Sequence, residues 1–520
     1  MGKPNSREVV SMKALISVYD KTGVVVLARA LQTAGYELVS TGGTHELLSK
    51  EGLDVQQVSE LTGSPEMLDG RVKTLHPVVH GGLLARRDLP EHMAQLDKHG
   101  MDTIDVVVVN LYPFETTVSR EGIPDQEILE NIDIGGPTML RAAAKNHPAV
   151  TVVVDPADYT WVAESFAKGG TSAEERHTLA ATAFAHVSFY DSIVASWLRG
   201  PKDTFPKEMT VAVRRVTELR YGENPHQKAA LYANAPETGG VVSADQLHGK
   251  ELSYNNILDA DAAWRSVNEF SEQAVSIIKH TNSCGLAVDE DQAEAFRKAF
   301  AGDPISAYGG IVGFNRPVTG KAVEALRKVF FEVIVAPGYE PEALEVLQKK
   351  RDLRILLVPP TPGGPSLGAP LQVRRVSGGL LYQGPDTLEE DSDRWTIVTD
   401  RAPTRQEMDD LVFAWKAAKH IKSNTIVLAK DRALIGMGAG QPNRITSVHL
   451  ATRTADERTI GTVLASDAFF PFADGVELAA ESGISAVVQP GGSIRDDEVI
   501  AAANKAGIAM VFTSVRHFLH

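Results

Sequence analysis

The feature that most constrains the fold is a regular alternation of short apolar segments with amphipathic ones, starting at residue 14. The apolar segments end at polar residues or glycine, and the segments between them have the residue spacing of helices. This pattern predicts an α/β domain in which a parallel sheet is covered by helices on both faces. The expected strands are 14–20, 36–40, 104–112 and 149–155, and the expected helices are 24–35, 44–52, two pieces within 128–146 and a longer stretch near 172–199.

The chain changes character at residues 200–210, a polar stretch broken by proline that predicts a domain boundary. We therefore expect a first domain at residues 1–205 and a second at 206–520. The second domain has strand candidates at 274–280, 333–337 and 425–430, a Pro/Gly-rich stretch at 358–370 and an acidic stretch at 385–393. These two interruptions predict sub-domains at about 211–370 and 390–520.

An excess of acidic residues limits the partners of the chain. Its 520 residues carry 52 Lys and Arg against 67 Asp and Glu, a net charge of −15, which disfavours nucleic acid and anionic membranes. No apolar run is long enough to cross a membrane, and the polar residues 1–13 lack the apolar core of a signal peptide. The single cysteine excludes internal disulfides and cysteine-rich zinc modules. We expect a cytoplasmic protein that holds anionic ligands through local clusters of cations and backbone N–H groups.

Two loops that follow expected strands are candidates for binding phosphate. The segment SVYDKTG (17–23) follows the first strand, and STGGT (40–44) follows the second and opens a helix. Ligands of parallel α/β folds gather at the carboxyl ends of the strands, and glycines at a helix N-terminus let backbone N–H groups approach an anion. A plain strand–helix turn would have the same sequence, so the loop alone leaves both interpretations open.

Further polar residues are expected at the same sheet edge. Arg71 and Lys73 point the same way if their segment is extended, Tyr112 ends the central strand, and Asp133 precedes a Gly-Gly turn. Lys145 lies on the helix that follows this turn. A solvated helix face would explain Lys145 and core packing would explain Tyr112, but their shared position at strand ends favours a pocket for an anionic ligand.

The segment IIKHTNSCG (277–285) holds the only cysteine, Cys284, shortly after Lys279 and His280. It could be a thiol nucleophile with its base, one corner of a metal site, or a segment in which the sulfur has no chemical role. The chain lacks the partners that a metal site needs and shows no acid–thiol arrangement. We interpret Cys284 as a small buried residue in the turn after the strand. Lys279 and His280 then carry the chemistry, and they must lie at a strand end or bend to share a site.

These motifs belong to a longer ordered series, and the series resembles a known enzyme family. Its members are SVYDKTG (17–23), STGGT (40–44), GRVKTLHP (70–77), NLYPF (110–114), DIGGPTMLRAAAKNH (133–147), LRYGENPHQ (219–227), KHTNSCG (279–285), DPISAYGG (303–310), APGYEPEAL (336–344), GAGQPNRI (438–445), SDAFFPF (466–472) and RHFLH (516–520). In this order they resemble the bifunctional purine biosynthesis family, which combines AICAR transformylase with IMP cyclohydrolase. The resemblance spans nearly the whole chain.

The resemblance implies a fold and two activities. The N-terminal domain would be similar to methylglyoxal synthase, and the C-terminal part would contain duplicated cytidine-deaminase-like α/β domains without the deaminase zinc. Formyl transfer from the cosubstrate 10-formyltetrahydrofolate to AICAR would give formyl-AICAR, which then closes to IMP with loss of water. Neither step would use a metal. The family also implies a homodimer with transformylase sites built across the interface.

For the cyclohydrolase, the resemblance places Lys73, Tyr112, Asp133 and Lys145 around the reacting groups. Our hypothesis is that the two lysines stabilise the oxyanion while Asp133 and Tyr112 orient the amide and relay protons. The 5′-phosphate would be held, with help from Arg71, by Lys21, Thr22, Ser40, Thr41, Gly42, Gly43 and Thr44.

For the transformylase, His280 would be the base, Lys279 the cation near the tetrahedral oxygen or the leaving group, and Asn424 a further group at the reaction centre. A lone histidine is more often structural than catalytic, so the pair alone is a weak signal. The resemblance adds substrate-binding candidates, which are Arg220, Tyr221, His226, Gly309, Glu332, Arg444, Phe469, Phe470 and Arg516.

Two other functions remain as alternatives. A single-activity lyase of the methylglyoxal synthase type would act on a phosphate ligand, but the long C-terminal part argues against it. A nucleotide-binding regulatory protein is the second alternative, and the presence of the expected polar groups in both halves argues against that.

Overall fold

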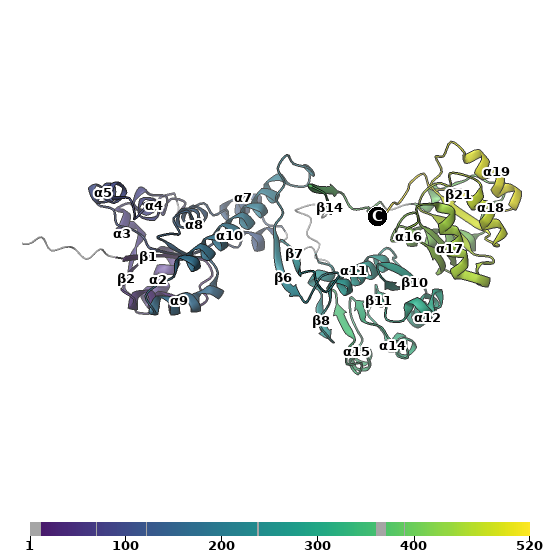
Figure 1. Cartoon of the computed structure of the whole chain (residues 1–520), viewed down its shortest axis with the longest axis horizontal. Coiled ribbons are helices and arrows are strands. Elements are labelled where there is room, and N and C mark those ends of the chain that lie inside the picture. Colours follow the sequence, from purple (N-terminus) through teal and green to yellow (C-terminus); the bar gives the residue numbers. More distant parts are fainter. Residues whose placement is uncertain (1–11, 69, 121, 237–238, 360–370, 389–390) are drawn as a thin grey trace, which may run out of the picture. The chain divides into compact units, whose positions relative to one another are not determined.

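The computed structural model describes residues 12–68, 70–120, 122–236, 239–359, 371–388 and 391–520. Its contacts divide the chain into two units, with the boundary between Val213 and Arg214 and with Asn234–Pro236 belonging to the first unit (Figure 1). Most of the Pro/Gly-rich stretch at 358–370, and part of the acidic stretch at 385–393, lie outside the described residues. Within the described ranges, no helix is both long and apolar enough to cross a membrane.

The first unit is built on a five-stranded sheet with the order β3-β2-β1-β4-β5, in which every pairing is parallel. The inner strand β4 is buried along its whole length, as expected for a parallel sheet covered on both faces. Its strands are β1 (Met12–Val18), β2 (Tyr36–Ser40), β3 (Val55–Gln57), β4 (Val106–Asn110) and β5 (Thr151–Val153).

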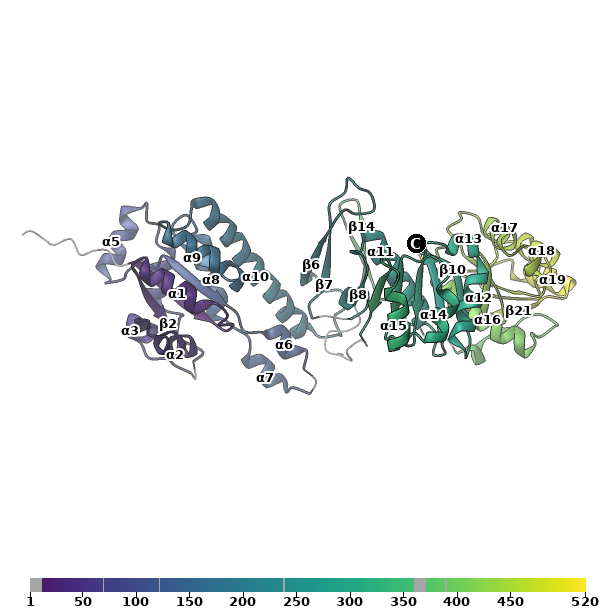
Figure 2. The ribbon, with the colours of Figure 1, turned by 90° about the horizontal axis from the view of Figure 1, so that it is seen from below.

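Helices cover this sheet in two contacting pairs, α1 with α9 and α8 with α10. Because crossovers between parallel strands are right-handed and the strand order reverses at β1, α1 and α8 lie on opposite faces. Figures 1 and 2 show α8 beside the long α10 in both views. The helices are α1 (Val24–Thr33), α2 (Gly42–Lys50), α3 (Val58–Thr62), α4 (Pro77–Leu84), α5 (Pro90–Lys98), α6 (Phe114–Val118), α7 (Asp125–Glu130), α8 (Gly135–Lys145), α9 (Tyr159–Ala167) and α10 (Ala173–Arg199), with a 3-10 turn at Pro156–Asp158.

The predicted parallel α/β architecture of this unit is confirmed, with one shift that matters for the site. Helix α2 begins at Gly42 instead of 44, because Thr41 is the extended N-cap residue and both glycines of STGGT form the first helical turn. The first backbone N–H groups of a helix have no intrahelical acceptor. In this chain those N–H groups therefore belong to the two glycines.

The second unit contains one 12-stranded sheet, with the order β16-β21-β20-β19-β17-β18-β10-β9-β11-β12-β13-β8. Its first half uses α11 (Tyr254–Asn268), β9 (Ala274–Lys279), β10 (Asn282–Val288), α12 (Gln292–Gly302), α13 (Pro304–Ala307), β11 (Ile311–Phe314), α14 (Gly320–Leu326), β12 (Val333–Ala336), α15 (Pro341–Gln348) and β13 (Arg354–Leu357). Its second half uses α16 (Arg405–Ala418), β17 (Ile426–Lys430), β18 (Ala433–Gly438), α17 (Arg444–Ala455), β19 (Val463–Ser466), α18 (Asp474–Glu481), β20 (Ala486–Gln489), α19 (Asp496–Ala506) and β21 (Ala509–Phe512).

The two halves are copies of one motif. Each has a helix, a β-hairpin and then alternating helices and strands, and the strand order reads the same outward from the β18–β10 pair. The same number of positions separates Asp259 from Asp410 and Trp264 from Trp415 on the opening helices. The two copies share one continuous sheet, because β10 pairs with β18 at Ala287 and Ala433.

A glycine in each hairpin allows the following helix to pack closely on the sheet. A Cβ at Gly285 would lie 1.8 Å from the carbonyl oxygen of Ala299, and one at Gly436 would lie 2.4 Å from that of Ala451. Any side chain at either position would push α12 or α17 off the sheet.

The remaining strands of the chain are short additions. Two small two-stranded ribbons are formed by β6 with β7 and by the antiparallel pair β14 and β15, and single strands extend the large sheet at both ends. Their bounds are β6 (Val213–Leu219), β7 (Ala229–Asn234), β8 (Asp245–His248), β14 (Gln372–Val376), β15 (Gly379–Gln383) and β16 (Thr396–Ile397).

An ion pair joins the ends of the two opening helices. Glu269, at the end of α11, accepts hydrogen bonds from Lys419 Nζ at 3.0 Å and His420 Nε2 at 2.9 Å, at the end of α16. Burial raises the pKa of Glu269, but the hydrogen bonds and charges of His420 and Lys419 outweigh it and hold the pKa at about 2. The folded state therefore favours the ionised carboxylate.

We predict that Glu269→Gln lowers the free energy of unfolding by on the order of 2–3 kcal/mol at pH 7. Because the pKa of Glu269 is depressed in the folded state, its contribution is complete above its ordinary pKa and disappears as the pH falls towards about 2. Urea denaturation at several pH values should show the wild type and the variant converging at low pH. Glu345→Gln, which removes an exposed pair with Lys349, is the control and should change stability little; a similar loss for both variants would contradict the assignment.

Candidate active sites

The first candidate site lies where the neighbouring strands β2, β1 and β4 end. Asn110, the last residue of β4, holds the loop after β1: its Oδ1 accepts the N–H groups of Tyr19 at 2.6 Å and Asp20 at 3.0 Å, and its Nδ2 donates to the Asp20 carbonyl at 2.9 Å. Asn110 was not predicted as a site residue; the sequence feature that could have identified it is a polar residue at the end of a run of valines.

Two residues predicted to bind phosphate use their hydroxyl groups for hydrogen bonds within the domain. Ser40 Oγ donates to the Ile16 carbonyl at 2.6 Å, and Thr44 Oγ1 donates to the Val18 carbonyl and accepts the Val18 N–H. Both side chains are buried. Ser40 and Thr44 therefore fasten the loop to β1 through their hydroxyl groups. Thr41 Oγ1 forms a hydrogen bond of 2.7 Å with Ser17 Oγ.

Cationic and backbone groups do meet at the start of α2. A Cβ at Gly43 would lie 3.9 Å from Lys21 Nζ, so the amine is close to the first helical turn. Gly42 precedes it in that turn, and the Thr22 N–H is held by the Asp20 carboxylate at 2.9 Å. A helix N-terminus beside a lysine is a favourable place for a phosphate.

Asp133 is fixed between its own turn and α10. Its Oδ1 accepts the Gly136 N–H at 2.9 Å, and its backbone N–H donates to the Tyr190 hydroxyl at 2.8 Å. Tyr190 Oη in turn donates to the Asn131 carbonyl at 3.2 Å. A Cβ at Gly136 would lie 2.5 Å from Asp133 Oδ2, so glycine is required there. Tyr190 was missed, because an aromatic residue within a helical pattern carries no signal of such a role.

Lys73 and Asp133 are close enough to interact electrostatically. Burial raises the pKa of Asp133, while the N–H groups of Gly136 and Gly135 and the charge of Lys73 oppose that rise. Lys73 Nζ also lies 3.7 Å from Glu66 Oε1. Tyr112 is exposed, and its ring centroid lies 5.5 Å from that of Tyr19 on the neighbouring loop.

Two other predicted residues have partners of their own. Arg71 forms an ion pair with Glu130. Lys145 is the last residue of α8, about 15 Å from Gly135 by helical rise, and it lines a different pocket of about 440 Å³ with His147 and His177. The structure thus brings Lys73 and Asp133 together, but it does not bring Lys145 to them.

The second candidate site is built on the β9–β10 hairpin. Lys279 is the last residue of β9, His280 and Thr281 form the turn, and β10 begins at Asn282. The expectation that the Lys-His pair lies at a strand end is confirmed. Lys279 Nζ donates to the Tyr308 carbonyl at 2.9 Å, and His280 is exposed.

Cys284 lies in strand β10, not in the turn, which corrects the sequence interpretation. It is the extra residue of a β-bulge, because Ser283 pairs with Ile278 and Gly285 with Ile277. It is buried as expected, and burial raises the pKa of its thiol to about 12. A thiol of this kind is a poor nucleophile at neutral pH. Among the described residues, no three His, Cys, Asp or Glu side chains are grouped so that they could hold a metal ion.

The first turns of α11 collect the groups of this site. Asn255 Nδ2 donates to the Glu223 carbonyl at 3.4 Å, and Asn256 Nδ2 donates to Glu332 Oε2 at 2.9 Å. One turn later, Asp259 accepts the two N–H groups of the hairpin turn. One helix therefore ties the loop at 219–227, the acid Glu332 and the Lys-His turn together.

Other predicted nucleotide contacts lie on the connected loops. Arg220 Nη2 donates to the Tyr221 hydroxyl at 3.1 Å and stacks over its ring. Gly309, with φ of 75°, donates its N–H to the Phe330 carbonyl at 2.8 Å, next to Tyr308. His226 is exposed in the same loop as Arg220, and within the described part of the chain no contact links it to His280.

In the second half of the sheet, Asn424 is held at both ends of its amide. Its Oδ1 accepts from Arg444 Nη2 at 2.7 Å, and its Nδ2 donates to the Gln441 carbonyl at 2.8 Å. The amide has a second Nδ2 hydrogen, which can be donated to a further acceptor.

Arg444 supports Asn424 from within the protein. It is 6% exposed and donates Nη1 hydrogen bonds to Ser466 at 2.7 Å and to the fully buried Asp467. Its Nη2 donates to Asn424, so three of its five N–H groups are used within the protein. Arg444 therefore orients Asn424, and a direct contact with a substrate stays a prediction.

The two phenylalanines of SDAFFPF also separate. Phe470 is 1% exposed and packs in the core with Leu464 and Val476, so it has no surface for a substrate ring, and that prediction is wrong. Phe469 is exposed. Arg516 stacks over Phe518, which lines a pocket of about 330 Å³ together with Asn424 and His520.

Strand pairing brings the two halves of this site to one edge of the sheet. Because β10 and β18 are antiparallel, the start of β10 lies toward the end of β18, and β18 pairs with β17 so that Gly438 faces Ile426. The Lys-His turn before β10 and Asn424 before β17 therefore share an edge.

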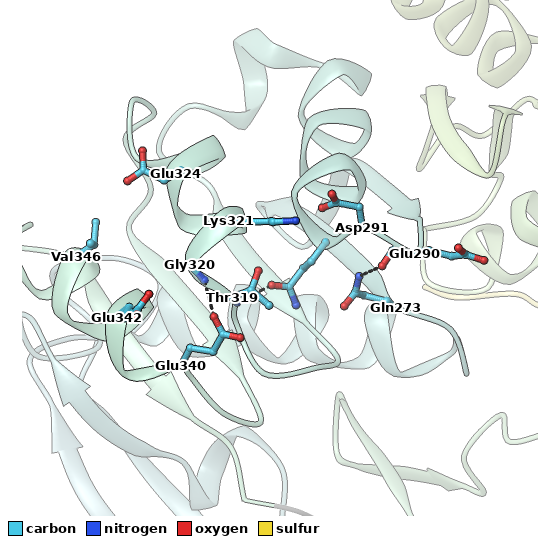
Figure 3. A pocket seen from close by; sticks show the side chains of 11 residues that line it. Gln273, Glu290, Asp291, Thr319, Gly320, Lys321, Glu324, Glu340, Glu342 and Val346 are labelled. Carbon is cyan, nitrogen blue, oxygen red and sulfur yellow. Dashed lines mark hydrogen bonds between the residues drawn. The ribbon is translucent and has the colours of Figure 1, made fainter.

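A larger pocket, of about 750 Å³, lies elsewhere in the first half of the sheet and contains none of the predicted site residues (Figure 3). Figure 3 shows Glu340 accepting the Gly320 N–H and Gln273 donating to the Glu290 carbonyl. Its acidic side chains are Glu290, Asp291, Glu324, Glu340 and Glu342, with Lys321 as the one cation among the lining residues. Such a surface repels anionic ligands, so we do not assign the chemistry to it.

Comparison with known proteins shows the family to which the chain belongs. A model of the MGS-like domain matches residues 23–138, and a model described as the AICARFT/IMPCHase bienzyme matches residues 143–454. Similar proteins include the bifunctional purine biosynthesis protein purH of Dictyostelium discoideum, 50% identical over 98% of this chain and 100% of that protein. The PurH protein of Persephonella marina is 51% identical over 98% of this chain and 99% of that protein. A solved structure titled "Crystal structure of ForH" is 37% identical over 35% of this chain and 95% of that chain, with a TM-score of 0.33. The chain has an MGS-like N-terminal domain and belongs to the AICARFT/IMPCHase bienzyme family.

Proposed function

We propose that this chain transfers a formyl group from 10-formyltetrahydrofolate to AICAR and then closes formyl-AICAR to IMP with loss of water. The observation that carries the proposal is the Lys279–His280 pair, in which the backbone is tied to α11 while the imidazole is exposed. The near-full-length similarity to bifunctional purine biosynthesis proteins supports both activities.

In formyl transfer, the 5-amino group of AICAR attacks the formyl carbon bound to N10 of the folate. This amine is conjugated with a carboxamide and is a weak nucleophile, so His280 accepts its proton as the new C–N bond forms. Lys279 stabilises the negative charge on the tetrahedral oxygen. The bond to N10 then breaks, and N10 takes a proton as it leaves.

Asn424 adds a hydrogen-bond donor to the same reaction. Arg444 and the Gln441 carbonyl fix the orientation of its amide, so its second N–H can face the developing oxyanion without reorganisation. Arg220 and Tyr221 lie on the loop tied to α11 and are proposed to bind the nucleotide, with Glu332 and Gly309 nearby.

Ring closure is assigned to the MGS-like domain. The carboxamide nitrogen attacks the formyl carbon of the same molecule, and water then leaves, so holding the two groups in contact supplies much of the rate. Lys73 stabilises the oxyanion, and Asp133, whose pKa is raised by burial, exchanges protons with the amide. Lys21 and the first turn of α2 hold the 5′-phosphate.

We predict that the wild-type protein converts AICAR and 10-formyltetrahydrofolate to IMP, and chromatography of the reaction products measures this conversion. Formation of formyl-AICAR without IMP would support the transferase activity and contradict the cyclohydrolase activity. No consumption of AICAR would favour the lyase or the regulatory protein instead.

A Lys73→Met variant should lose cyclisation by about 100-fold or more, because the oxyanion loses its nearest cation. Formyl transfer should stay unchanged, since it is assigned to residues of the second unit. The cyclisation rate is measured by supplying formyl-AICAR directly, and the rate of formyl transfer is measured by the release of tetrahydrofolate. Lys50→Met, at an exposed position at the end of α2, is the control; equal loss of both activities in Lys73→Met would contradict the assignment.

A His280→Ala variant should show the reverse pattern, with formyl transfer about 100-fold or more slower and cyclisation intact. Cys284→Ala, a change in the same hairpin, should keep most formyl transfer, because its thiol has no chemical role. Stopped-flow absorbance of the folate product measures both variants. A loss in Cys284→Ala with activity retained in His280→Ala would return the chemistry to the thiol.

We further propose that the chain acts in the cytoplasm as a homodimer in which both subunits contribute to each transformylase site, as the family resemblance implies. Dilution that separates the subunits should then remove formyl transfer before cyclisation. Sedimentation velocity at the same concentrations gives the oligomeric state. A monomer with full formyl transfer would refute the shared site.

A further inference from the structure

The turn that carries His280 has an uncommon backbone. His280 has φ of 53° and Thr281 has φ of 58°, both left-handed, as in a two-residue type I′ hairpin. Such turns favour Asn and Gly, and a β-branched residue such as Thr281 is disfavoured at positive φ. Histidine occurs at positive φ more often than most residues, but Thr281 opposes this conformation, so contacts from outside the turn must offset the strain at Thr281.

Asp259 on α11 supplies that contact. One carboxylate oxygen accepts the His280 N–H at 3.1 Å, and the other accepts the Thr281 N–H at 2.6 Å. The His280 carbonyl accepts from Thr281 Oγ1 at 2.7 Å and from Asn282 Nδ2 at 2.9 Å. Both sides of the His280 main chain are therefore fixed, and the ring position depends only on its own side-chain torsions.

The second half of the sheet contains the same arrangement without the catalytic pair. Asp431 and Arg432 form the β17–β18 turn with φ of 53° and 54°, and Asp410 on α16 accepts the Arg432 N–H at 2.6 Å. The spacing from Asp259 to Asp410 equals that from His280 to Asp431. Lys430 also matches Lys279, since its Nζ donates to the Ile460 carbonyl at 3.2 Å.

We propose that Asp259 is a positioning residue for formyl transfer, which holds the left-handed turn so that the His280 imidazole reaches the amine of AICAR. The inference rests on the proposed transferase function of this site. The duplicated arrangement separates its two roles: both aspartates stabilise a hairpin, but only Asp259 stabilises one that carries a base. Asp410 is therefore a matched control within the same chain.

The test compares Asp259→Asn with Asp410→Asn in the full-length protein. An asparagine keeps one acceptor oxygen but turns an NH₂ group towards the second backbone N–H, so the turn loses one charge-assisted hydrogen bond. Both variants should lower the thermal midpoint to a similar extent. Only Asp259→Asn should lower kcat for formyl transfer, by about 10- to 100-fold, with KM for AICAR nearly unchanged because Arg220 and Tyr221 are untouched.

A second change asks whether the turn conformation is the cause. Glycine adopts left-handed φ without strain, so Thr281→Gly in the Asp259→Asn background should recover most of the lost kcat. Thr281→Gly alone should stay close to wild type. In the His280→Ala background, Asp259→Asn should cause no further loss, because Asp259 acts only through His280.

Each outcome decides between explanations. Equal kcat in Asp259→Asn and Asp410→Asn, or a glycine variant that restores stability but not kcat, would overturn the positioning role. A multiplicative loss in the His280→Ala background would assign Asp259 to general stability. If the wild-type protein shows no formyl transfer, the proposed function fails, whereas active wild type with unaffected Asp259→Asn removes only this inference.

Discussion

The pairing of β10 with β18 is the contact on which the second unit depends. It joins two copies of one motif into a continuous sheet, so residues far apart in the chain share one edge. The Lys-His turn comes from the first copy and Asn424 from the second, and neither copy alone holds both. Because the two strands are antiparallel, the arrangement also produces a second, equivalent edge, where the β17–β18 turn faces the start of β9. A duplicated fold thus offers two sites, and the sequence decides which of them can be used.

The two edges differ in the side chains that lie at the start of the following helix and at the end of the neighbouring strand. At the Asn424 edge, Arg444 opens α17 and Asp467 follows β19, and their buried ion pair fixes the Asn424 amide. At the matching positions of the first copy, Gln292 opens α12 and Asn315 follows β11. Both of these amides are bonded to main-chain atoms, Gln292 to Thr319 and Pro317 and Asn315 to Ala274, Phe270 and Glu272. The corresponding pocket is acidic, so one edge is suited to anionic substrates and the other is not.

The sequence pattern predicted most of the parallel sheet of the first unit, because its buried strands are apolar throughout and its helices are amphipathic. It did not predict the second strand of either hairpin. Strand β10 has the sequence NSCGLAV, which contains polar residues and a glycine that the backbone of α12 approaches closely. These residues are set by local packing, so the strand lacks a recognisable pattern of apolar residues. For the same reason Cys284 was placed in a turn, whereas the bulge keeps it in the strand. The roles of Arg444 and Phe470 were also beyond the sequence, since a motif does not state whether a side chain points to a ligand or into the protein.

Asp259 shows where a closer comparison of the chain with itself would have helped. The helices α11 and α16 share the order Asp, Ala and Trp at equal spacing, Asp259-Ala263-Trp264 and Asp410-Ala414-Trp415. Local propensity treats each aspartate as an ordinary helix residue, because its partners are backbone N–H groups of a turn that follows much later in the chain. Only the fold places the carboxylate under that turn. Once the two copies are aligned, a residue kept in both is explained by the hairpin, and a residue present in one, such as His280, is a candidate for the chemistry.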